Sequence, residues 1–380
     1  MDEPEFRVVD PMRRFLWWFT PPAATAVVAL VVLLLAGHVT GPLKHITVVR
    51  ALLASKREFF EDEQVKRILM ANGFQVQITP AGSFELAEKE DLDSFGFVFP
   101  SGQTAADRVW ERRQGKHAVG FEPFFTPIVL ATYREYADAL VNAKVAKPQP
   151  NSRLYYDLDM AGLVKLIDGG ALWSTYGGLT NGNRMLAQSP DPCRSYSGAV
   201  YLGLVAFARY GHPPASEAEA AEMGRELKPM FDAEGQHGED MAPKYFVPEG
   251  RSFATVAVIY EHQFLTYQVK QQERTGRLDD DRVLLYPSAQ HETAPELISQ
   301  SEEGDEIGRL LMENPQLRRR AVEMGFHVLN TGGDPELDFA GFLGSRGIPV
   351  PTTGVGNTET WLPSRTLFKR MIEEVGGCGW

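Results

Sequence analysis

The stretch FQVQITPAGSFELAEKED (residues 74–91), followed by FGFVFPSGQTAADRVWERR (residues 95–113), decides the fold. In both, a short strand-like run ends in a turn that contains Gly and Ser, and a segment with helical character follows. A strand, a Gly/Ser turn and a helix, repeated along the chain, are typical of an α/β protein with a parallel sheet. Ligands of such sheets bind beyond the carboxyl ends of the strands, so the two turns indicate a binding edge.

The same alternation continues through the rest of the chain. Strands are predicted at residues 45–52, 124–133, 253–262 (a strand that enters a helix), 282–290 and 326–330, and helices at residues 61–73, 134–143, 159–170, 197–211, 305–313, 317–325 and 364–375. The stretch VAKPQPNS (residues 145–152) is typical of a linker. The polar residues 215–241 are expected to form a solvated helix and loop. A chain of 380 residues is long enough for two lobes with separate cores.

Composition and charge exclude several classes of protein. The formal net charge of −12 argues against a nucleic-acid partner, because nucleic-acid-binding proteins carry a basic face. An acidic protein can still bind a small anion, since a few backbone N–H groups create a local positive site. The eight His are scattered, and the sequence contains neither HExxH nor CxxC. We therefore expect no metal site and no cofactor.

The segment FLWWFTPPAATAVVALVVLLLAG (residues 15–37) carries no charge and is long enough to span a bilayer. Arg7, Arg13 and Arg14 precede it, which favours a cytoplasmic N-terminal segment (residues 1–14) and an extracytoplasmic remainder. We therefore expect a transmembrane signal anchor. A cleaved signal peptide is the main alternative, although the apolar run is long and lacks a small-x-small site. A buried core helix is a third reading, but the segment is terminal and apolar all round.

Export would make the two cysteines informative. Cys193 and Cys378 would reach an oxidising compartment, where a disulfide between them would join the chain's end to its middle. Two separate free thiols are the alternative.

A third Gly/Ser turn lies in SPDPCRSYSGAVYLGLVAF (residues 189–207). Ser195 and Ser197 precede a strongly apolar helix, whose free N–H groups, together with two hydroxyls, suit an oxyanion or a carboxylate. Ordinary helix capping is the alternative explanation, and for this turn taken alone it is the preferred one. Two other turns repeat the arrangement where a strand feeds a helix, at Gly82 with Ser83 and at Ser101 with Gly102.

The segment YEHQFL (residues 260–265) places Glu261 and His262 at the end of an apolar strand. They could contact a ligand, pair with each other, or simply begin a helix. The sequence has no GxSxG elbow, no P-loop and no GxGxxG, so we do not expect an enzyme. A hydrolase that uses Ser with His262 or His291 is the remaining enzymatic alternative.

Taken together, several segments resemble bacterial extracellular solute-binding proteins with the type II periplasmic-binding fold, of the subgroup related to molybdate- and sulfate-type ABC binding proteins. The resemblance is carried by EFFEDEQVKRILMANGFQVQITPAGSFELA, DSFGFVFPSG, FFTPIVLATY, SPDPCRSYSG, VIYEHQFL, VLLYPSAQHETAPELI and NTETWLPSRTLFKRMI. It implies two α/β lobes, the first made of residues 44–150 and 290–380 and the second of residues 151–289. It also implies a ligand cleft lined by Gly82, Ser83, Ser101, Thr126, Ser195 and Ser197, with Tyr260 and Glu261 near the second crossing between lobes.

The resemblance and the N-terminal segment predict a membrane-anchored, extracytoplasmic binding protein. It would capture a small polar or anionic solute and deliver it to an ABC permease. A cell-envelope scaffold or sensor that reuses the fold without transport is the alternative.

Overall fold

The computed structural model describes residues 46–235, 237–352 and 362–378. The predicted anchor at residues 15–37 and the segment that precedes it lie outside these ranges. Within the described ranges, no helix is both long and apolar enough to cross a membrane. The strands and helices described below belong to one compact unit, Thr47–Trp380.

A five-stranded sheet forms the first lobe. Its strand order is β2 (Phe74–Pro80), β1 (Thr47–Leu53), β3 (Phe97–Phe99), β11 (Leu297–Ser299) and β4 (Val119–Phe121). β1 pairs in parallel with β2 and β3, whereas β11 is antiparallel to β3 and β4. The predicted parallel arrangement of the first three strands is confirmed. It brings the turns that follow these strands to one edge of the sheet.

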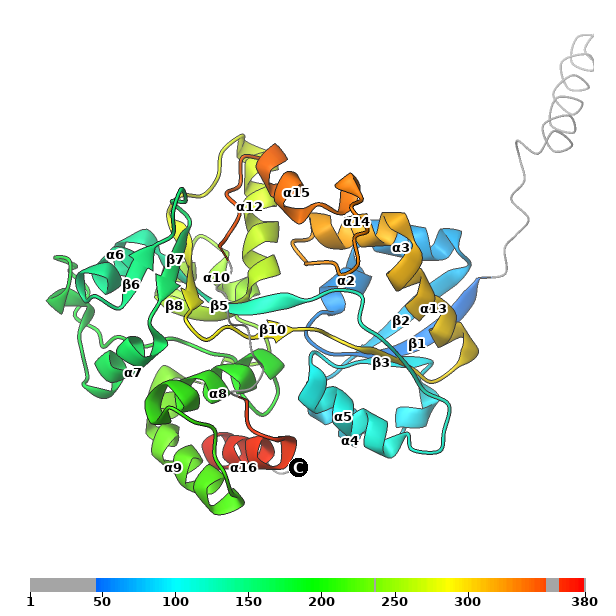
Figure 1. Cartoon of the computed structure of the whole chain (residues 1–380), viewed down its shortest axis with the longest axis horizontal. Helices are drawn as coiled ribbons and strands as arrows, with labels where there is room; N and C mark the ends of the chain where they lie inside the picture. Colours follow the sequence, from blue (N-terminus) through cyan, green and yellow to red (C-terminus); the bar gives the residue numbers. More distant parts are fainter. Residues whose placement is uncertain (1–45, 236, 353–361, 379–380) are drawn as a thin grey trace, which may run out of the picture. The chain divides into compact units, whose positions relative to one another are not determined.

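Helices cover both faces of this sheet (Figure 1). One face packs on α2 (Arg57–Glu61), α3 (Glu63–Ala71), α13 (Glu302–Glu313) and α14 (Pro315–Glu323), and the other on α4 (Glu85–Glu88) and α5 (Gln103–Arg112). Side chains of a strand point alternately to the two faces. Phe97 and Phe99 of β3 therefore join the first core, and Val98 joins the second.

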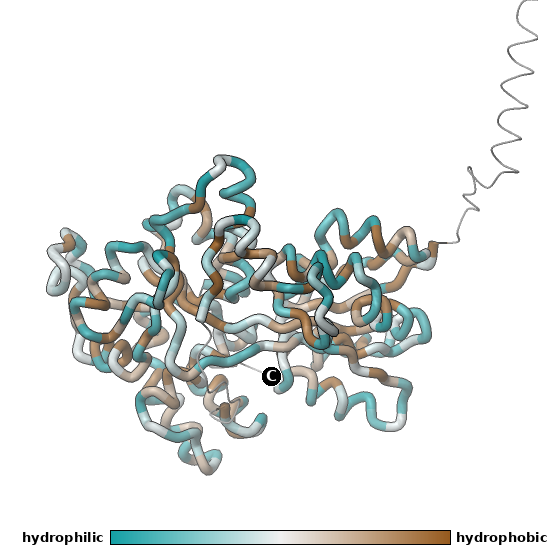
Figure 2. Tube along the Cα trace, turned by 45° about the horizontal axis from the view of Figure 1, so that its top comes forward, coloured by the Kyte–Doolittle hydropathy of each residue, from teal (hydrophilic) through white to brown (hydrophobic). Residues whose placement is uncertain are grey.

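A six-stranded sheet forms the second lobe. Its order is β10 (Glu292–Thr293), β5 (Thr126–Tyr133), β9 (Arg282–Pro287), β7 (Tyr155–Leu158) and β6 (Ala146–Pro148), and β8 (Val256–Tyr260) also pairs with β5. Every residue of β5 and β8 is buried. Hydrophobic residues accordingly gather along the strands, and hydrophilic residues along the outer loops and helix faces (Figure 2).

The helices of the second lobe share one large core with this sheet. They are α6 (Arg134–Asn142), α7 (Met160–Asp168), α8 (Tyr196–Tyr210), α9 (Glu217–Glu234), α10 (Ala242–Tyr245), α11 (Gly250–Phe253), α12 (Glu261–Thr275), α15 (Phe339–Ser345) and α16 (Arg365–Gly376). Short 3₁₀ helices lie at Leu92–Ser94, Trp173–Thr175 and Pro335–Leu337. α16 lies beside α9 (Figure 1).

The two sheets divide the chain at other points than the resemblance implies. Thr126–Tyr133 pairs within the second sheet, although residues 126–150 were expected in the first lobe. This strand is apolar throughout, and β8 and β9 supply its hydrogen bonds. The expected linker at residues 145–152 contains β6, which pairs with β7.

The C-terminal helix also belongs to the second lobe rather than to the first. Phe368, Met371, Ile372 and Val375 of α16 pack in the second core. The expected disulfide is confirmed: it joins Cys193 to Cys378, with the two Cα atoms 5.7 Å apart, and fastens the end of α16 to the turn before α8. The predicted strand at residues 326–330 is wrong in extent, since it forms a single bridge between Phe125 and His327.

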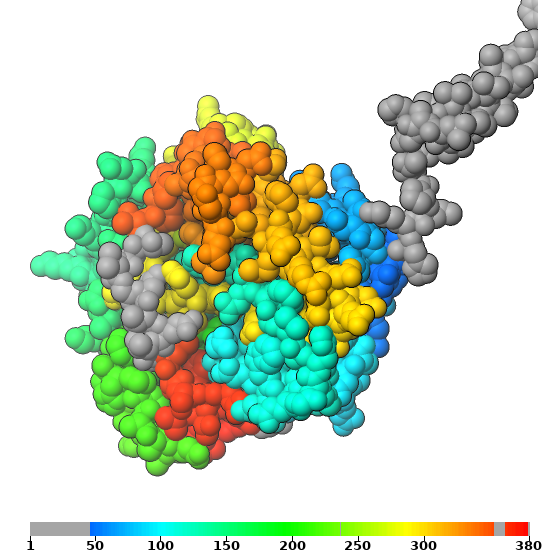
Figure 3. Space-filling view, turned by 45° about the vertical axis from the view of Figure 1, so that its right-hand side comes forward, coloured from blue at the N-terminus to red at the C-terminus, as the bar shows by residue number. Residues whose placement is uncertain are grey.

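The two lobes touch directly along the edge where the turns meet. Gly102 lies so close to the ring of Tyr196 that a Cβ there would collide with it, and a Cβ on Gly82 would come within 2.6 Å of the carbonyl oxygen of Arg194. On the same side of the molecule, Arg365 of α16 forms an ion pair with Glu111 of α5. Figure 3 shows the C-terminal residues, in red, beside residues of the first lobe in cyan.

Candidate functional site

The turn after β1 meets the turn after β3, because the two strands are parallel neighbours. The backbone N–H of Ser55 donates to Oγ of Ser101 at 3.0 Å, and the two hydroxyl oxygens are 2.6 Å apart. The ammonium of Lys56 donates to the carbonyl oxygen of Ser101 at 3.1 Å. Three residues of the first lobe thus converge at the carboxyl ends of its strands.

The second lobe adds hydroxyls to the same place. Tyr260 ends β8, and its hydroxyl oxygen is 3.2 Å from that of Ser55. Ser195 is the N-cap residue of α8, and its Oγ is 3.0 Å from Oγ of Ser197, which in turn hydrogen-bonds to Tyr260. We call Ser55, Ser101, Ser195, Ser197 and Tyr260 the hydroxyl cluster. It bridges the two lobes.

Lys56 lies against this cluster and is completely buried. Its ammonium is 3.7 Å from the centre of the Tyr260 ring, a cation–π contact. Burial lowers the pKa of Lys56 well below its ordinary value, and the more distant carboxylates of Glu58 and Asp240 oppose that shift. Among the described residues, no carboxylate forms an ion pair with Lys56. A buried ammonium without a counter-charge is costly, so the position favours an anion.

A second basic side chain lies near Lys56. His291 is buried, and burial together with the charge of Lys56 lowers its pKa to about 3. At neutral pH this imidazole is uncharged. A bound anion would act on both groups in the same direction, by favouring their protonated forms.

The other predicted site residues lie in two places: Gly82 and Ser83 are in the turn after β2, and Thr126 and Glu261 are in a hydrogen-bond network. Gly82 gives the loop at Arg194 room for its close approach, and Ser83 is buried with a hydroxyl that lacks a hydrogen-bond partner among the described residues. Thr126 and Glu261 belong to an internal network. Thr126 Oγ1 is 3.2 Å from Nδ1 of His262, whose Nε2 is 2.6 Å from a carboxylate oxygen of Glu58.

Glu261 is fully buried and satisfied within the protein. It accepts a hydrogen bond from the hydroxyl of Tyr286 at 2.7 Å and lies 2.5 Å from Nε2 of His327. This network joins the lobes beside the hydroxyl cluster. It also occupies both ring nitrogens of His262, which therefore has no serine as its partner.

A cavity of about 600 Å³ borders the hydroxyl cluster at Ser55 and opens between the lobes. The residues that line it are Ser55, Arg57, Glu58, Glu61, Asp62, Glu239, Asp240, Ala242, Pro243, Phe246, His262, Gln263, Thr266, Tyr267, Lys270 and Met324. None of the eight residues predicted to bind ligand is among them. Burial and the nearby charge of Glu58 raise the pKa of Asp240 to about 6.

Sequence reasoning did not identify Ser55 and Lys56. A signal was available, since both follow a predicted strand in the same way that Ser101 follows the next one. Elsewhere, within residues 46–235, 237–352 and 362–378, no group of three or more His, Cys, Asp or Glu side chains is arranged to hold a metal ion.

Comparisons with known proteins bear on the fold. No protein-family model matches the sequence, and no curated protein matches it. Iron-bound HitA from Pseudomonas aeruginosa is similar in structure, with a TM-score of 0.51 and 14% identity over 87% of this chain and 100% of that one. FutA2 from Synechocystis PCC6803 has a TM-score of 0.47 and 12% identity over 87% of this chain and 99% of that one.

The sulfate-binding protein SubI from Mycobacterium tuberculosis H37Rv has a TM-score of 0.43 and 14% identity, and covers 81% of this chain and 93% of that one. At 14% identity, the likeness to HitA establishes the fold and not the ligand. The two sheets, the crossings between them and the similarity to HitA agree with the predicted architecture. The chain therefore has the two-lobed fold of the type II periplasmic solute-binding proteins.

Proposed function

We propose that this protein is a solute-binding receptor that holds a small anionic solute between its lobes, at Lys56 and the hydroxyl cluster. The observation that carries the proposal is the buried ammonium of Lys56, which contacts the carbonyl oxygen of Ser101 in the first lobe and the ring of Tyr260 in the second. Among the described residues it forms no ion pair with a carboxylate. An anion placed there would supply the missing charge and accept hydrogen bonds from both lobes. Those bonds would favour the closed arrangement.

In the structure, the lobes are closed on their own side chains. Ser55 contacts Ser101 and Tyr260 directly, and Tyr196 covers Gly102. A solute would enter when the lobes part, and would then replace these direct contacts. Fully buried Ser83, whose hydroxyl lacks a partner among the described residues, is an additional donor for it.

Isothermal titration calorimetry of the full chain in detergent tests this proposal, with sulfate, molybdate, phosphate and acetate as probes. We expect at least one of these anions to bind. Lys56→Met should weaken that binding by at least about 30-fold, because a buried charge partner is worth about 2–5 kcal/mol. Lys66→Met, at an exposed position on α3, is the matched control and should bind normally.

A scaffold or sensor without a transported solute is the second candidate, and the direct contacts between the lobes favour it. On that reading Lys56 would be only a destabilising buried charge. Lys56→Met would then raise the free energy of unfolding, and none of the four anions would bind to either protein. This pair of results would exclude the receptor proposal.

We further propose that residues 15–37 anchor the receptor in the membrane and that an ABC permease receives the solute. The uncharged length of the segment and the two-lobed fold support this. Carbonate extraction of membranes tests the anchor: the full chain should stay in the pellet, and a chain from which these residues have been deleted should not.

A further inference from the structure

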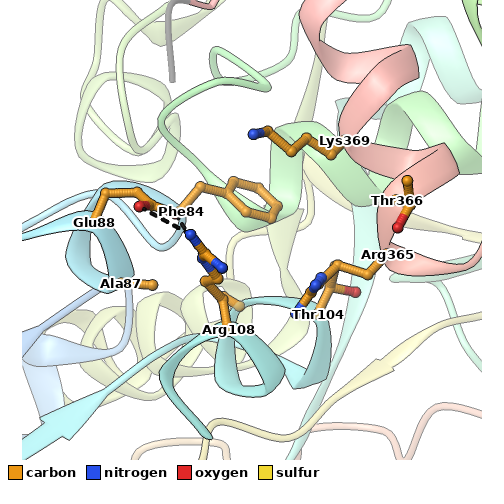
Figure 4. A pocket seen from close by; sticks show the side chains of 9 residues that line it. Phe84, Ala87, Glu88, Thr104, Arg108, Arg365, Thr366 and Lys369 are labelled. Carbon is orange, nitrogen blue, oxygen red and sulfur yellow. Dashed lines mark hydrogen bonds and ion pairs between the residues drawn. The ribbon is translucent and has the colours of Figure 1, made fainter. Parts of the chain in front are cut away.

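A second cavity lies between α5 of the first lobe and α16 of the second, and no residue of the hydroxyl cluster lines it (Figure 4). Its volume is about 190 Å³. The residues that line it are Phe84, Ala87, Glu88, Thr104, Ala105, Arg108, Arg365, Thr366 and Lys369. It is therefore a small, partly polar space between the lobes.

The side chains that line this cavity carry more positive than negative charge, although the whole chain has a net charge of −12. Arg108, Arg365 and Lys369 line it together with one carboxylate, that of Glu88, which accepts from Arg108 at 2.8 Å. Glu111, just outside the cavity, pairs with both Arg108 and Arg365. The lining itself thus holds three cations and one carboxylate.

The pKa of Glu88 is affected by these basic side chains. Hydrogen bonding to Arg108 lowers the pKa of Glu88, and the charges of Arg108, Arg112 and Lys369 add to the shift. This is the effect expected of positive charges close to a carboxylate. Lys369 also lies 3.5 Å from Glu373, one turn along α16, and a helix-surface pair of this kind is weak enough for a bound anion to compete with it.

Two helices also begin at this cavity. Thr104 and Ala105 lie in the first turn of α5, and Arg365 and Thr366 lie in the first turn of α16. Neither helix has an N-cap side chain that hydrogen-bonds to its first turn. The positive ends of two helix dipoles thus add to three basic side chains and two threonine hydroxyls.

We propose that this cavity is a second anion site, which takes inorganic phosphate or a phosphate monoester. A phosphate group has the size and charge for the space, and can accept from the guanidinium groups, the ammonium and the threonine hydroxyls together. Since α5 and α16 belong to different lobes, the bound anion would also hold the lobes closed on this side.

Calorimetric titration of inorganic phosphate into the full chain in detergent tests the site. The titration uses a Lys56→Met background, so that binding at the cleft does not contribute. We expect Lys369→Gln and Arg108→Gln each to weaken phosphate binding by at least about tenfold, the loss of one charge-assisted contact of about 1.4 kcal/mol. Lys66→Gln, which removes an exposed ion-paired lysine from α3, should change the affinity less than about twofold.

The charge-retaining variant Lys369→Arg controls for misfolding and should bind nearly as the parent does. Equal phosphate affinity in all these variants would overturn the proposal, because binding would then be elsewhere. So would the absence of phosphate binding in the Lys56→Met background. A third result would separate the two proposals. If the Lys56→Met variant binds phosphate, and if each of the four anions binds this variant and the unsubstituted protein with the same affinity, the second site is supported. The receptor proposal then fails.

Discussion

The hydroxyl oxygen of Ser55 in the first lobe lies 3.2 Å from that of Tyr260 in the second. This contact links Ser101 to Ser197, because Ser55 hydrogen-bonds to Ser101 and Tyr260 hydrogen-bonds to Ser197. The pair therefore holds together residues that are far apart in the sequence and come from different sheets.

Removal of the Tyr260 hydroxyl should weaken both the closed state and anion binding. We expect Tyr260→Phe to lower the free energy of unfolding by about 1–2 kcal/mol, because Ser55 and Ser197 each lose a buried partner. Urea unfolding measures the change. Tyr210→Phe removes an exposed hydroxyl bond to Glu226 and should cost less than about 0.5 kcal/mol. Equal losses in the two variants would mean that the hydroxyl cluster stabilises the protein no more than an exposed hydrogen bond does.

A methyl group at Gly102 should force the lobes apart. Gly102→Ala places a Cβ against the ring of Tyr196, and we expect destabilisation of about 1–3 kcal/mol from overpacking. The radius of gyration from small-angle X-ray scattering should rise, because the contact joins two lobes. Gly344→Ala, in α15, meets no atom within 4 Å and should leave the radius unchanged. A stable Gly102→Ala protein with an unchanged radius would show that Tyr196 moves aside instead.

The free energy of unfolding should decrease as the pH is lowered, because the pKa of His291 is lower in the folded protein than in the unfolded chain. Its pKa is lowered to about 3 in the folded protein. Below about pH 6.5, His291 therefore becomes protonated in the unfolded chain but stays neutral in the folded protein. The stabilisation is present above the unfolded pKa and is lost as the pH falls toward 3, by up to about 1.4 kcal/mol per pH unit.

Urea midpoints measured between pH 4 and pH 8 check this dependence on pH. His291→Gln should flatten the decline below about pH 6.5. His212→Gln changes an exposed histidine after α8 and serves as the control. An unaltered slope in His291→Gln would assign the acid sensitivity to other groups, of which buried His262, whose pKa is also lowered by burial, is the first to test.

Loss of the disulfide should destabilise the second lobe. The bond spans 185 residues, and a disulfide that closes a long loop strongly restricts the unfolded chain. The double variant Cys193→Ser with Cys378→Ser should therefore lose about 2–5 kcal/mol in the free energy of unfolding. The helical signal in far-ultraviolet circular dichroism should persist, because α16 also packs on α9 through its apolar face. Unchanged stability would show that this packing alone fixes the C-terminal helix.

The sequence pattern predicted the secondary structure well where the apolar residues of the pattern are the ones that the fold buries. β1, β2, β3, α3, α8 and α16 lie within a few residues of the predicted ranges. For the polar stretch at residues 215–241, the sequence predicted a solvated helix, but one face of this helix is buried. α9 has Met223, Leu227, Met230 and Phe231 buried along one face, and the helix packs against α16 from the far end of the chain. A partner so remote in sequence leaves no local signal.

The candidate site was only partly predictable, for a similar reason. The turns at Gly82, Ser101 and Ser195 were visible because Gly and Ser at a strand end have a local meaning. Lys56 was not, since a lysine in a turn is normally exposed, and only the packing of the second lobe over it makes it buried.

The sequence by itself determined the alternating strands and helices, the parallel pairing of the first three strands and the two cysteines available for a disulfide. Hydrophobic periodicity and turn chemistry are local properties, so these features follow from neighbouring residues. Only the tertiary structure decided the division of the lobes, the burial of Lys56 and the meeting of α5 with α16. Each of these depends on which surfaces pack together across long sequence separations, and packing is a property of the whole chain.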